Sequence, residues 1–410
     1  MDARRTGSLS NGQTPVSSTR PSHKAGKPRL QTPPGASTSG AMRDASVIIV
    51  GGGVIGCAIA LRLSQAGARV TVLERAIAGA EASNAAGGIL APQMESEGPG
   101  PFLELCLRSR ALYPDFAAEL LALTGVNVNY LPSGLLHVAF DGAGARRLET
   151  TVEWQRALKL RAELLGAAEV HALEPQLSPH VVAAARFPDD HQVDNRLLTR
   201  ALTMAAAKVG ATFRTGYVRG VVEEKGRVVG VDMDGDTLRA DAVVIAAGSW
   251  SGLVQGLSVD PRVVRPARGQ MVQLQTRLPL FSHVIFSDKG YLIPRADGRV
   301  LAGSTLEFAG FEKNVTAEGL HRILALAMEL CPALGSTPVQ ETWAGLRPYT
   351  DDHLPILGAG PLPGLFLATG HFRNGILLAP ITARLLAQAV LGETPSLDLT
   401  PFRFDRFPRR

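Results

Sequence analysis

The stretch that decides the fold is Ser46-Val47-Ile48-Ile49-Val50-Gly51-Gly52-Gly53-Val54-Ile55-Gly56. Residues 47–50 form an apolar, β-branched run that is typical of a buried parallel strand, and the glycines follow it directly. Gly51, Gly53 and Gly56 fit the pattern G-x-G-x-x-G. In this pattern the glycines allow a tight turn, bring the backbone close to a pyrophosphate, and let the next helix pack against the strand. The stretch therefore predicts a strand, a turn and a helix that bind a dinucleotide.

The residues that follow continue the pattern of a nucleotide-binding unit. Apolar spacing predicts a helix at 54–65, whose N-terminus would offer free N–H groups and a positive dipole end to phosphates. A second buried strand is expected at 69–73, and Glu74 at its end is placed to hydrogen-bond ribose hydroxyls. These elements come in the required order, but they do not distinguish FAD from NAD.

The composition is that of an ordinary globular protein. The 410 residues are 45% hydrophobic and 19% charged, which suits two or three domains with a large core. No apolar stretch reaches the length of a membrane helix, and the N-terminus lacks the apolar region of a signal peptide. We therefore expect a cytoplasmic protein without membrane association.

The positive charge is concentrated at the N-terminus. Residues 1–41 contain six Lys or Arg and one Asp, which accounts for the formal net charge of +5 and leaves the remainder neutral. Residues 1–43 are predicted to be a disordered basic tail, because they are rich in Ser, Thr, Pro and Gly and have no hydrophobic period. The tail could be dispensable, or lie upstream of a true start at Met42. The alternatives are a tether to nucleic acid or acidic surfaces, or a targeting peptide, although the neutral remainder argues against a nucleic-acid partner.

Cysteine and histidine spacing gives no sign of a metal or redox motif. Cys57, Cys106 and Cys331 form no C-x-x-C pair and are odd in number. We expect reduced, structural thiols and no metal site.

The small residues after Glu74 form a second candidate ligand contact. Residues 80–92 contain Ser83-Asn84 and Gly87-Gly88 among alanines, so the backbone could lie against a flat or charged ligand. The alternative is a plain Gly/Ala loop. Beyond it, helices expected at 102–123 and 146–165 and a strand at 129–138 do not continue the βαβ series, and they predict an inserted second domain.

Two later stretches return the chain to the nucleotide-type domain. Residues 243–247 and 365–369 are buried-strand candidates that each lead to a glycine. The second leads to a helix that ends near residue 391; Asn374 can cap this helix and Pro380 either delays or kinks it. Elsewhere the patterns predict helices at 195–209 and 317–330 and strands at 212–213, 218–223, 227–232, 271–274, 290–294 and 299–302.

Five segments carry a resemblance to a known family. They are Gly51–Gly56 with Glu74, Ser83–Ile89, Ala246-Ala247-Gly248-Ser249-Trp250, Trp343-Ala344-Gly345-Leu346-Arg347-Pro348, and Gly370-His371-Phe372-Arg373-Asn374-Gly375-Ile376. Together they resemble the D-amino acid oxidase family of flavoproteins and, within it, the glycine oxidases of the thiamine pathway. The resemblance spans residues 46–391, and the His-Phe-Arg-Asn-Gly segment is the part most particular to glycine oxidases.

The resemblance implies a fold, a cofactor and partners. The fold is α/β plus α+β, with a Rossmann-type FAD-binding domain at 44–95, 188–254 and 343–400. A discontinuous substrate domain, built on an antiparallel sheet, covers 96–187 and 255–342. The FAD is bound non-covalently, the partners are a small amino acid or amine and oxygen, and the chain forms a homo-oligomer, either a dimer or a tetramer.

The resemblance also implies roles for single residues. The substrate is held by Tyr291, Arg347 and Arg373, residue types that suit a carboxylate because arginine binds it bidentately and tyrosine can donate to it. The residues expected to bind FAD are Gly51, Gly53, Val54, Ile55, Gly56, Glu74, Arg75, Ala82, Ser83, Gly87, Gly88, Ile89, Val218, Gly248, His371, Phe372, Asn374, Gly375, Ile376 and Leu377. No side chain is expected to be catalytic, since flavin N5 would take the hydride and a neutral amine needs no base.

The expected reaction is the oxidative deamination of glycine, and of sarcosine or small D-amino acids, to the 2-oxo acid, ammonia and hydrogen peroxide. The glycine imine would supply thiamine thiazole synthesis. The alternatives are a D-amino acid dehydrogenase or a sarcosine oxidase on the same fold, an oxidoreductase associated with tRNA modification, and a flavin-binding protein without turnover. No cysteine stands near Arg347 or Arg373 in the sequence to tether a flavin covalently.

Overall fold

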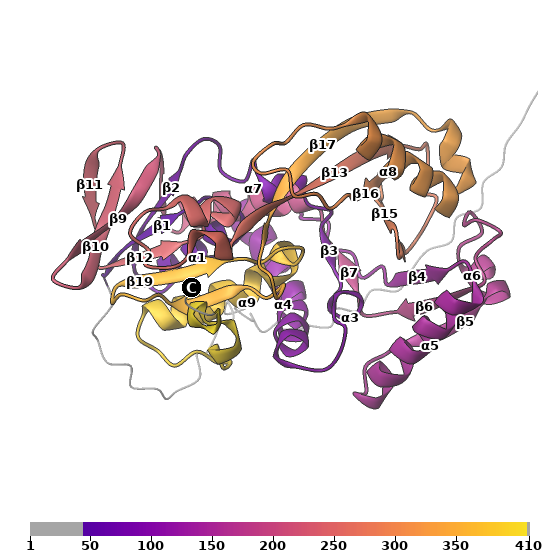
Figure 1. Ribbon diagram of the computed structural model, residues 1–410, viewed down its shortest axis with the longest axis horizontal. Helices are drawn as coiled ribbons and strands as arrows, with labels where there is room; N and C mark the ends of the chain where they lie inside the picture. The colour runs from indigo at the N-terminus through magenta and orange to yellow at the C-terminus, as the bar shows by residue number, and fades with distance from the viewer. Residues whose placement is uncertain (1–43, 408–410) are drawn as a thin grey trace, which may run out of the picture. The chain divides into compact units, whose positions relative to one another are not determined.

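The structure is a computed structural model that describes residues 44–407, so the predicted tail of residues 1–43 lies outside the described part. The predicted opening strand, β1, is an inner strand of a six-stranded sheet with the order β18-β19-β12-β1-β2-β8 (Figure 1). All neighbours in this sheet are parallel except β18 and β19. The strands are β1 Ser46–Val50, β2 Arg69–Glu74, β8 Thr212–Thr215, β12 Ala242–Ile245, β18 Ile356–Ala359 and β19 Leu365–Thr369.

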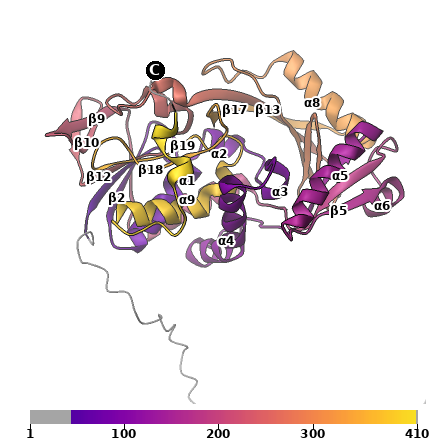
Figure 2. The ribbon, with the colours of Figure 1, turned by 60° about the horizontal axis from the view of Figure 1, so that its bottom comes forward.

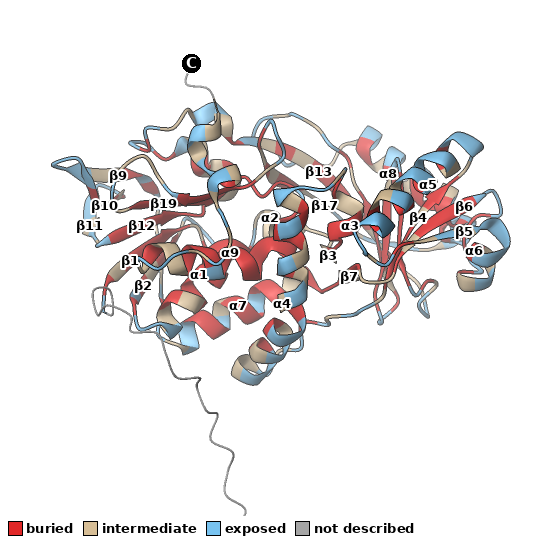
Figure 3. Cartoon of the chain, turned by 90° about the horizontal axis from the view of Figure 1, so that it is seen from below, coloured by how far each residue is buried: buried red, intermediate tan, exposed pale blue. Residues whose placement is uncertain are grey.

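The two faces of this sheet are covered by different elements, because successive side chains of a strand point to opposite sides. Val47 and Ile49 of β1 pack in a cluster with four helices, whereas Ile48 and Val50 pack with the antiparallel sheet β11-β10-β9. Figure 3 shows α1 and α9 as largely buried. The covering elements are α1 Val54–Gln65, α4 Pro101–Thr124, α7 Asn195–Lys208, α9 Gly375–Val390, β9 Val218–Glu224, β10 Arg227–Met233 and β11 Asp236–Arg239.

A second large sheet has eight strands in the order β17-β13-β16-β15-β14-β4-β6-β5. Its neighbours are antiparallel except for β14 and β4, which are parallel. Helices α6 and α8 pack on one face and α5 on the other. The elements are β4 Leu135–Ala139, α5 Gly142–Ala157, β5 Glu163–Gly166, α6 Ala167–Leu173, β6 Ala183–Phe187, β13 Arg265–Gln275, β14 Val284–Ser287, β15 Gly290–Pro294, β16 Arg299–Gly303, α8 Ala317–Leu330 and β17 Val339–Tyr349.

Four short elements lie between the two large sheets. They are α2 Ala82–Ala85, β3 Ile89–Leu90, α3 Pro92–Glu95 and β7 His191–Gln192. Strand β3 pairs with β7, α2 contacts both β17 and α7, and α3 lies beside α4 (Figure 2). The α2 part of the small-residue segment therefore lies between the eight-stranded sheet and a helix that covers the six-stranded sheet.

Most of the predicted elements are present, but two are wrong in part. The helix expected at 146–165 ends at Ala157, and residues 163–166 form β5 instead, because the chain turns at Lys159 with φ +62°. The strand expected at 129–138 is limited to β4, because Asn129 at φ +51° and Gly134 at φ +70° leave the extended conformation. Strand β17 crosses the predicted domain boundary at residue 343, and the domain limits stay a prediction.

Helix α9 runs through Pro380 without starting late. Proline cannot donate a backbone hydrogen bond, which frees a carbonyl in the preceding turn. The Ile376 carbonyl, four residues back, accepts a hydrogen bond from the Tyr113 hydroxyl, and the Leu377 carbonyl accepts one from Ser109 Oγ at 2.6 Å. Side chains of α4 thus satisfy the carbonyls near the proline.

Candidate active site

A large cavity opens at the carboxyl ends of β1, β2, β12 and β19, the usual ligand position in such sheets. Strands β15 and β17 of the eight-stranded sheet and helix α2 form its other walls. The predicted residues that line it are Gly51, Gly53, Val54, Ile55, Glu74, Arg75, Ala82, Ser83, Gly87, Gly88, Ile89, Val218, Gly248, Tyr291, Arg347, His371, Phe372, Arg373, Asn374, Gly375 and Ile376.

Two residues of the predicted cofactor set do not line the cavity. Gly56 lies under the turn, where an added Cβ would come within 1.9 Å of the Gly51 carbonyl oxygen. Its role is therefore the close packing of α1 on β1. The Leu377 side chain is 1% exposed and packs in the apolar cluster around α1 and α9.

The opening turn brings the backbone to the cavity wall. Gly51 has φ +108°, a conformation that favours glycine, and a Cβ there would lie 2.4 Å from the Ala246 carbonyl oxygen. Helix α1 then begins at Val54, whose N–H donates to Ser83 Oγ at 2.9 Å. The N–H groups of the first helical turn have no partner within the helix, so this end of the cavity suits an anion.

The acidic residue at the end of β2 is held by the backbone. The Glu74 carboxylate accepts hydrogen bonds from the N–H groups of Gly52 at 2.9 Å and Ala76 at 3.2 Å. The next residue, Arg75, pairs with Glu81 at 2.5 Å and stacks 3.8 Å from the centroid of the Trp250 ring. This fixes a carboxylate and an aromatic ring at the part of the cavity where the sequence predicts ribose.

The opposite wall contains the start of α9 and a buried histidine. His371 is 3% exposed, and its Nε2 lies 3.1 Å from Thr382 Oγ1. Burial lowers the pKa of His371 to about 3, so the imidazole is neutral at physiological pH. The neighbouring Phe372 has φ +45°, and its N–H donates to the Pro348 carbonyl at 3.0 Å. This turn positions the positive end of the α9 dipole at the cavity.

Arg347 and Tyr291 bring a cation and a phenol together at the eight-stranded sheet. Arg347 donates from Nη1 to the Thr305 carbonyl at 3.1 Å and from Nη2 to Ser304 Oγ at 2.6 Å. Burial lowers the pKa of Arg347, and the Tyr291 side chain opposes that shift. Sequence reasoning missed Gly269, where a Cβ would lie 2.2 Å from Arg347 Nη1, so only glycine leaves room for the guanidinium.

Arg373, the third predicted substrate residue, already has a carboxylate partner. Its Nε lies 2.8 Å from Glu95 Oε2, and its Nη2 lies 2.9 Å from Glu95 Oε1, so the pair is bidentate. The Glu95 carboxylate raises the pKa of Arg373. Sequence reasoning missed Glu95, because nothing in the local pattern of residues 92–95 connects it with a residue near the C-terminus.

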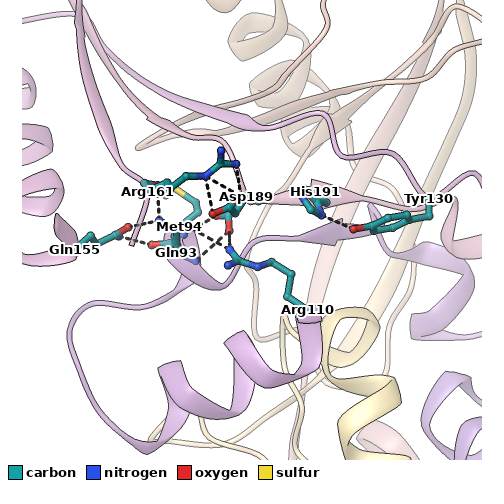
Figure 4. Close-up of polar contacts among 9 residues, drawn as sticks. Gln93, Met94, Arg110, Tyr130, Gln155, Arg161, Asp189 and His191 are labelled. Carbon is teal, nitrogen blue, oxygen red and sulfur yellow. Dashed lines mark hydrogen bonds and ion pairs between the residues drawn. The ribbon is translucent and has the colours of Figure 1, made fainter. Parts of the chain in front are cut away.

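A buried carboxylate holds the short helix that carries Glu95. Asp190 is fully buried, and its two oxygens accept the N–H groups of Gln93 at 3.3 Å and Met94 at 3.0 Å. Arg110 Nη1 lies 3.2 Å from the same carboxylate. Figure 4 shows Gln93, Met94 and Arg110 converging at this point beside Asp189. The predicted site did not include this cluster.

Arg295 anchors the small-residue segment from behind. It donates from Nη2 to the Gly87 carbonyl at 2.8 Å and from Nη1 to Gln192 Oε1 at 2.7 Å. Tyr291, Ile293 and Arg295 are alternate residues, so a strand places them on one face, and this alternation is the signal that could have identified Arg295. Burial lowers the pKa of Arg295 to about 10.

The residues present fit the chemical parts of FAD. Helix N-termini at α1 and α9, glycines with room that a Cβ would fill, and the Glu74 carboxylate suit phosphates, a flat ring and ribose hydroxyls respectively. Cys57, Cys106 and Cys331 are buried in apolar clusters and do not line the cavity. Within residues 44–407, no group of His, Cys, Asp or Glu could hold a metal ion.

A family profile described as "FAD dependent oxidoreductase" (DAO) matches residues 46–389. The chain belongs to this family. It is therefore an FAD-dependent oxidoreductase, and FAD is its cofactor. No helix in the described part of this oxidoreductase is long and apolar enough to cross a membrane.

The oxidoreductase is similar to proteins named glycine oxidase and ThiO/ThiG. The glycine oxidase of Geobacillus kaustophilus is 37% identical over 368 residues, which cover 88% of this chain and 96% of that protein. Its crystal structure superposes with a TM-score of 0.85 at 35% identity, covering 89% of this chain and 100% of that one. The bifunctional protein ThiO/ThiG of Nostoc sp. is 39% identical over 366 residues, 88% of this chain, but this chain spans only 55% of that relative.

Proposed function

We propose that this oxidoreductase oxidises glycine, and with it sarcosine or small D-amino acids, using oxygen as the electron acceptor. Glycine, oxygen and water would give glyoxylate, ammonia and hydrogen peroxide. The observation that carries the proposal is Arg347, a half-buried guanidinium in the cavity wall whose hydrogen-bond partners among residues 44–407 are neutral oxygens. The similarity to a protein named glycine oxidase supports it.

In this proposal, Arg347 and Tyr291 bind the substrate carboxylate. Arg347 supplies the positive charge, and the Tyr291 hydroxyl, which lies 3.4 Å from Met271 Sδ, can turn to donate to a carboxylate instead. Two anchoring points on a single carboxylate fix the direction of the α-carbon. When bound, FAD would accept the two electrons that the α-carbon loses.

Among residues 44–407, no side chain that lines the cavity is placed as a free base. His371 is neutral and bonded to Thr382, and Glu95 is held by Arg373. The protein would therefore bind the amino acid with a neutral amine and orient it, rather than remove a proton from carbon. Apolar side chains in the lining, such as Ala85 and Ile89, would limit the substrate to a small one.

The cellular role is also a proposal. The ThiO/ThiG name of the Nostoc relative supports a role in which the imine of glycine supplies thiamine thiazole synthesis. A cytoplasmic location and a homo-oligomer, dimer or tetramer, stay predictions.

The deciding experiment measures oxygen consumption and hydrogen peroxide release by the purified holoenzyme with glycine, sarcosine and D-alanine side by side. We expect equal amounts of peroxide and glyoxylate from glycine. Cofactor that is reduced by glycine but barely reoxidised by oxygen would instead show a dehydrogenase. An unreduced cofactor with all three substrates would reject the proposal. Acid precipitation is expected to release the FAD into the supernatant, since no thiol of the described residues lines the cavity.

A further inference from the structure

Three charged side chains line the cavity at its substrate end: Arg347, Arg373 and Glu95. Glu95 and Arg373 form an ion pair at this end of the cavity, and the charges of both act on the Arg347 guanidinium in the same lining. The remaining charged residues of the lining, Glu74, Arg75 and Glu81, belong to the part near β2. The formal charge at the substrate end is therefore +1.

The two arginines of this group are not equivalent. The charge of Arg373 is paired with the Glu95 carboxylate, which accepts hydrogen bonds from Nε and Nη2 and whose side chain is only 16% exposed. Arg347 contacts a carbonyl and a hydroxyl, both neutral. A single carboxylate therefore neutralises the group. A second carboxylate would meet an arginine whose charge Glu95 already neutralises, and the Glu95 carboxylate would repel it.

Glu95 is held in this position by the backbone. It is the last residue of α3, and the Asp190 carboxylate binds the N–H groups of Gln93 and Met94 in the same helix. Rotation of Glu95 away from Arg373 would break two charge-assisted hydrogen bonds between a carboxylate and a guanidinium, which is costly. The pair is thus a fixed part of the wall and does not act as a mobile gate.

We propose that Glu95 determines the charge of the substrate, by occupying Arg373 so that the site accepts amines with one carboxylate and rejects those with two. The inference rests on the proposed function only in that Arg347 binds a carboxylate. Removing the charge of Glu95 would expose Arg373 as a second carboxylate site.

The test compares two non-amine ligands that differ in one carboxylate, methoxyacetate and oxydiacetate. Their dissociation constants are measured from the change in the absorbance spectrum of the FAD-loaded protein, without turnover. In the wild-type protein, oxydiacetate is expected to bind about tenfold or more weakly than methoxyacetate. Equal or tighter binding of oxydiacetate by the wild-type protein would overturn the proposal, and this measurement needs no variant.

Variants then assign the effect to Glu95. Glu95→Gln is expected to shift the ratio of the two dissociation constants by about tenfold or more in favour of oxydiacetate, and Glu95→Gln/Arg373→Gln to reverse that shift. Glu95→Asp, which keeps the charge, and Glu97→Gln, at an exposed position in the same segment, are the matched controls and should keep the wild-type ratio. An unchanged ratio in Glu95→Gln, or the same shift in Glu97→Gln, would contradict the proposal.

Failure of this inference can be told apart from failure of the proposed function. If neither ligand perturbs the cofactor spectrum and glycine is not oxidised, the carboxylate-binding role of Arg347 is wrong, and the inference falls with it. If glycine is oxidised but the ligand ratio does not respond to Glu95, the inference alone is wrong.

Discussion

A half-buried arginine without a carboxylate partner has lost part of its hydration without compensation, and Arg347 is in this situation. Its two described hydrogen bonds go to neutral oxygens, and the neighbouring Arg373 adds a second positive charge. Burying an unpaired cation is unfavourable unless other groups compensate for the lost hydration. Gly269 provides the space for this guanidinium at the expense of a side chain. An anionic substrate would supply the missing negative charge beside Arg347, which explains why an unpaired arginine stands in the cavity wall.

Replacing Arg347 by alanine should therefore impair substrate binding more than cofactor binding. We expect kcat/KM for glycine to fall by about 10²–10³-fold, the loss typical of a bidentate, charge-assisted contact, while FAD stays bound. Steady-state peroxide release and the FAD content of the purified variant measure the two effects. Arg322→Ala, on the exposed side of α8, is the matched control and should behave as wild type. Wild-type kinetics in Arg347→Ala would remove the central support for the proposed function.

Single residues differ in how far the sequence could predict them. Arg347 was found through a family resemblance that its own segment carries, and Tyr291 through what that resemblance implies for the rest of the chain; both line the cavity. Glu95 and Asp190 act through partners distant in the sequence, Arg373 for the first and Arg110 for the second. A local sequence pattern does not identify such a partner, because the two residues come into contact only when the chain is folded.

At the level of elements, the strand–turn–helix opening depends on the close contact of β1 and α1. A Cβ on Gly56 would lie 1.9 Å from the Gly51 carbonyl oxygen, so the helix would have to move away from the turn. Gly56→Ala should lower the free energy of unfolding by about 1–3 kcal/mol and weaken FAD binding. Urea unfolding and FAD titration measure this. Gly98→Ala is the control, since a Cβ on Gly98 would have no described atom within 4 Å; similar losses in both variants would refute the packing argument.

Asp190, which accepts hydrogen bonds from the short helix α3, should make the stability of the protein depend on pH. Burial raises the pKa of Asp190 to about 7 from the ordinary 3.8. Between these values the folded state keeps a proton that the unfolded chain loses, so the stability due to this group falls as the pH rises and is constant above about 7. Asp190→Asn removes the titration. From about pH 5 to 7.5 we expect the wild type to lose about 1–3 kcal/mol relative to the variant.

Asp189, the residue before Asp190, provides the control for this measurement of stability against pH. The hydrogen bond from Arg161 lowers the pKa of Asp189, so its stabilising effect is lost only on acidification below about 4. Asp189→Asn should therefore show the same pH dependence as wild type between pH 5 and 7.5. Burial also lowers the pKa of His191, to about 4, but this group is present in all three proteins and cancels in the comparison. Parallel profiles for wild type and Asp190→Asn would show that Asp190 is ionised throughout.

Elements were predictable where a single periodicity runs through them. The helix at 54–65 and the strand at 290–294 have the predicted bounds, because buried apolar residues run through most of each element. The helix expected at 146–165 failed where the backbone turns at Lys159, a conformation that the spacing of apolar residues does not report. Helix α9 continues through Pro380 because hydroxyl groups of α4 bind the freed carbonyls, which again requires knowledge of a distant segment.

At the scale of the whole molecule, one cavity joins the two large sheets. Its lining comes from the ends of β1, β2, β12 and β19 on one side and from β15 and β17 on the other. A ligand that contacts both groups of strands stabilises only the state in which they are assembled around it. FAD therefore acts on the stability of the described chain as a whole, and its effect follows mass action.

Removing FAD should accordingly lower the unfolding temperature, and adding it back should raise the temperature in a concentration-dependent manner. At free FAD 100-fold above its dissociation constant the expected stabilisation is about 2.7 kcal/mol, increasing by about 1.4 kcal/mol for each further tenfold. Thermal unfolding of the apoprotein over a series of FAD concentrations measures this dependence. Gly56→Ala should need more FAD for the same increment, whereas Gly98→Ala should follow the wild-type curve. An unfolding temperature independent of FAD would mean that FAD does not bind the folded state in preference to the unfolded one, because such binding must stabilise the folded state.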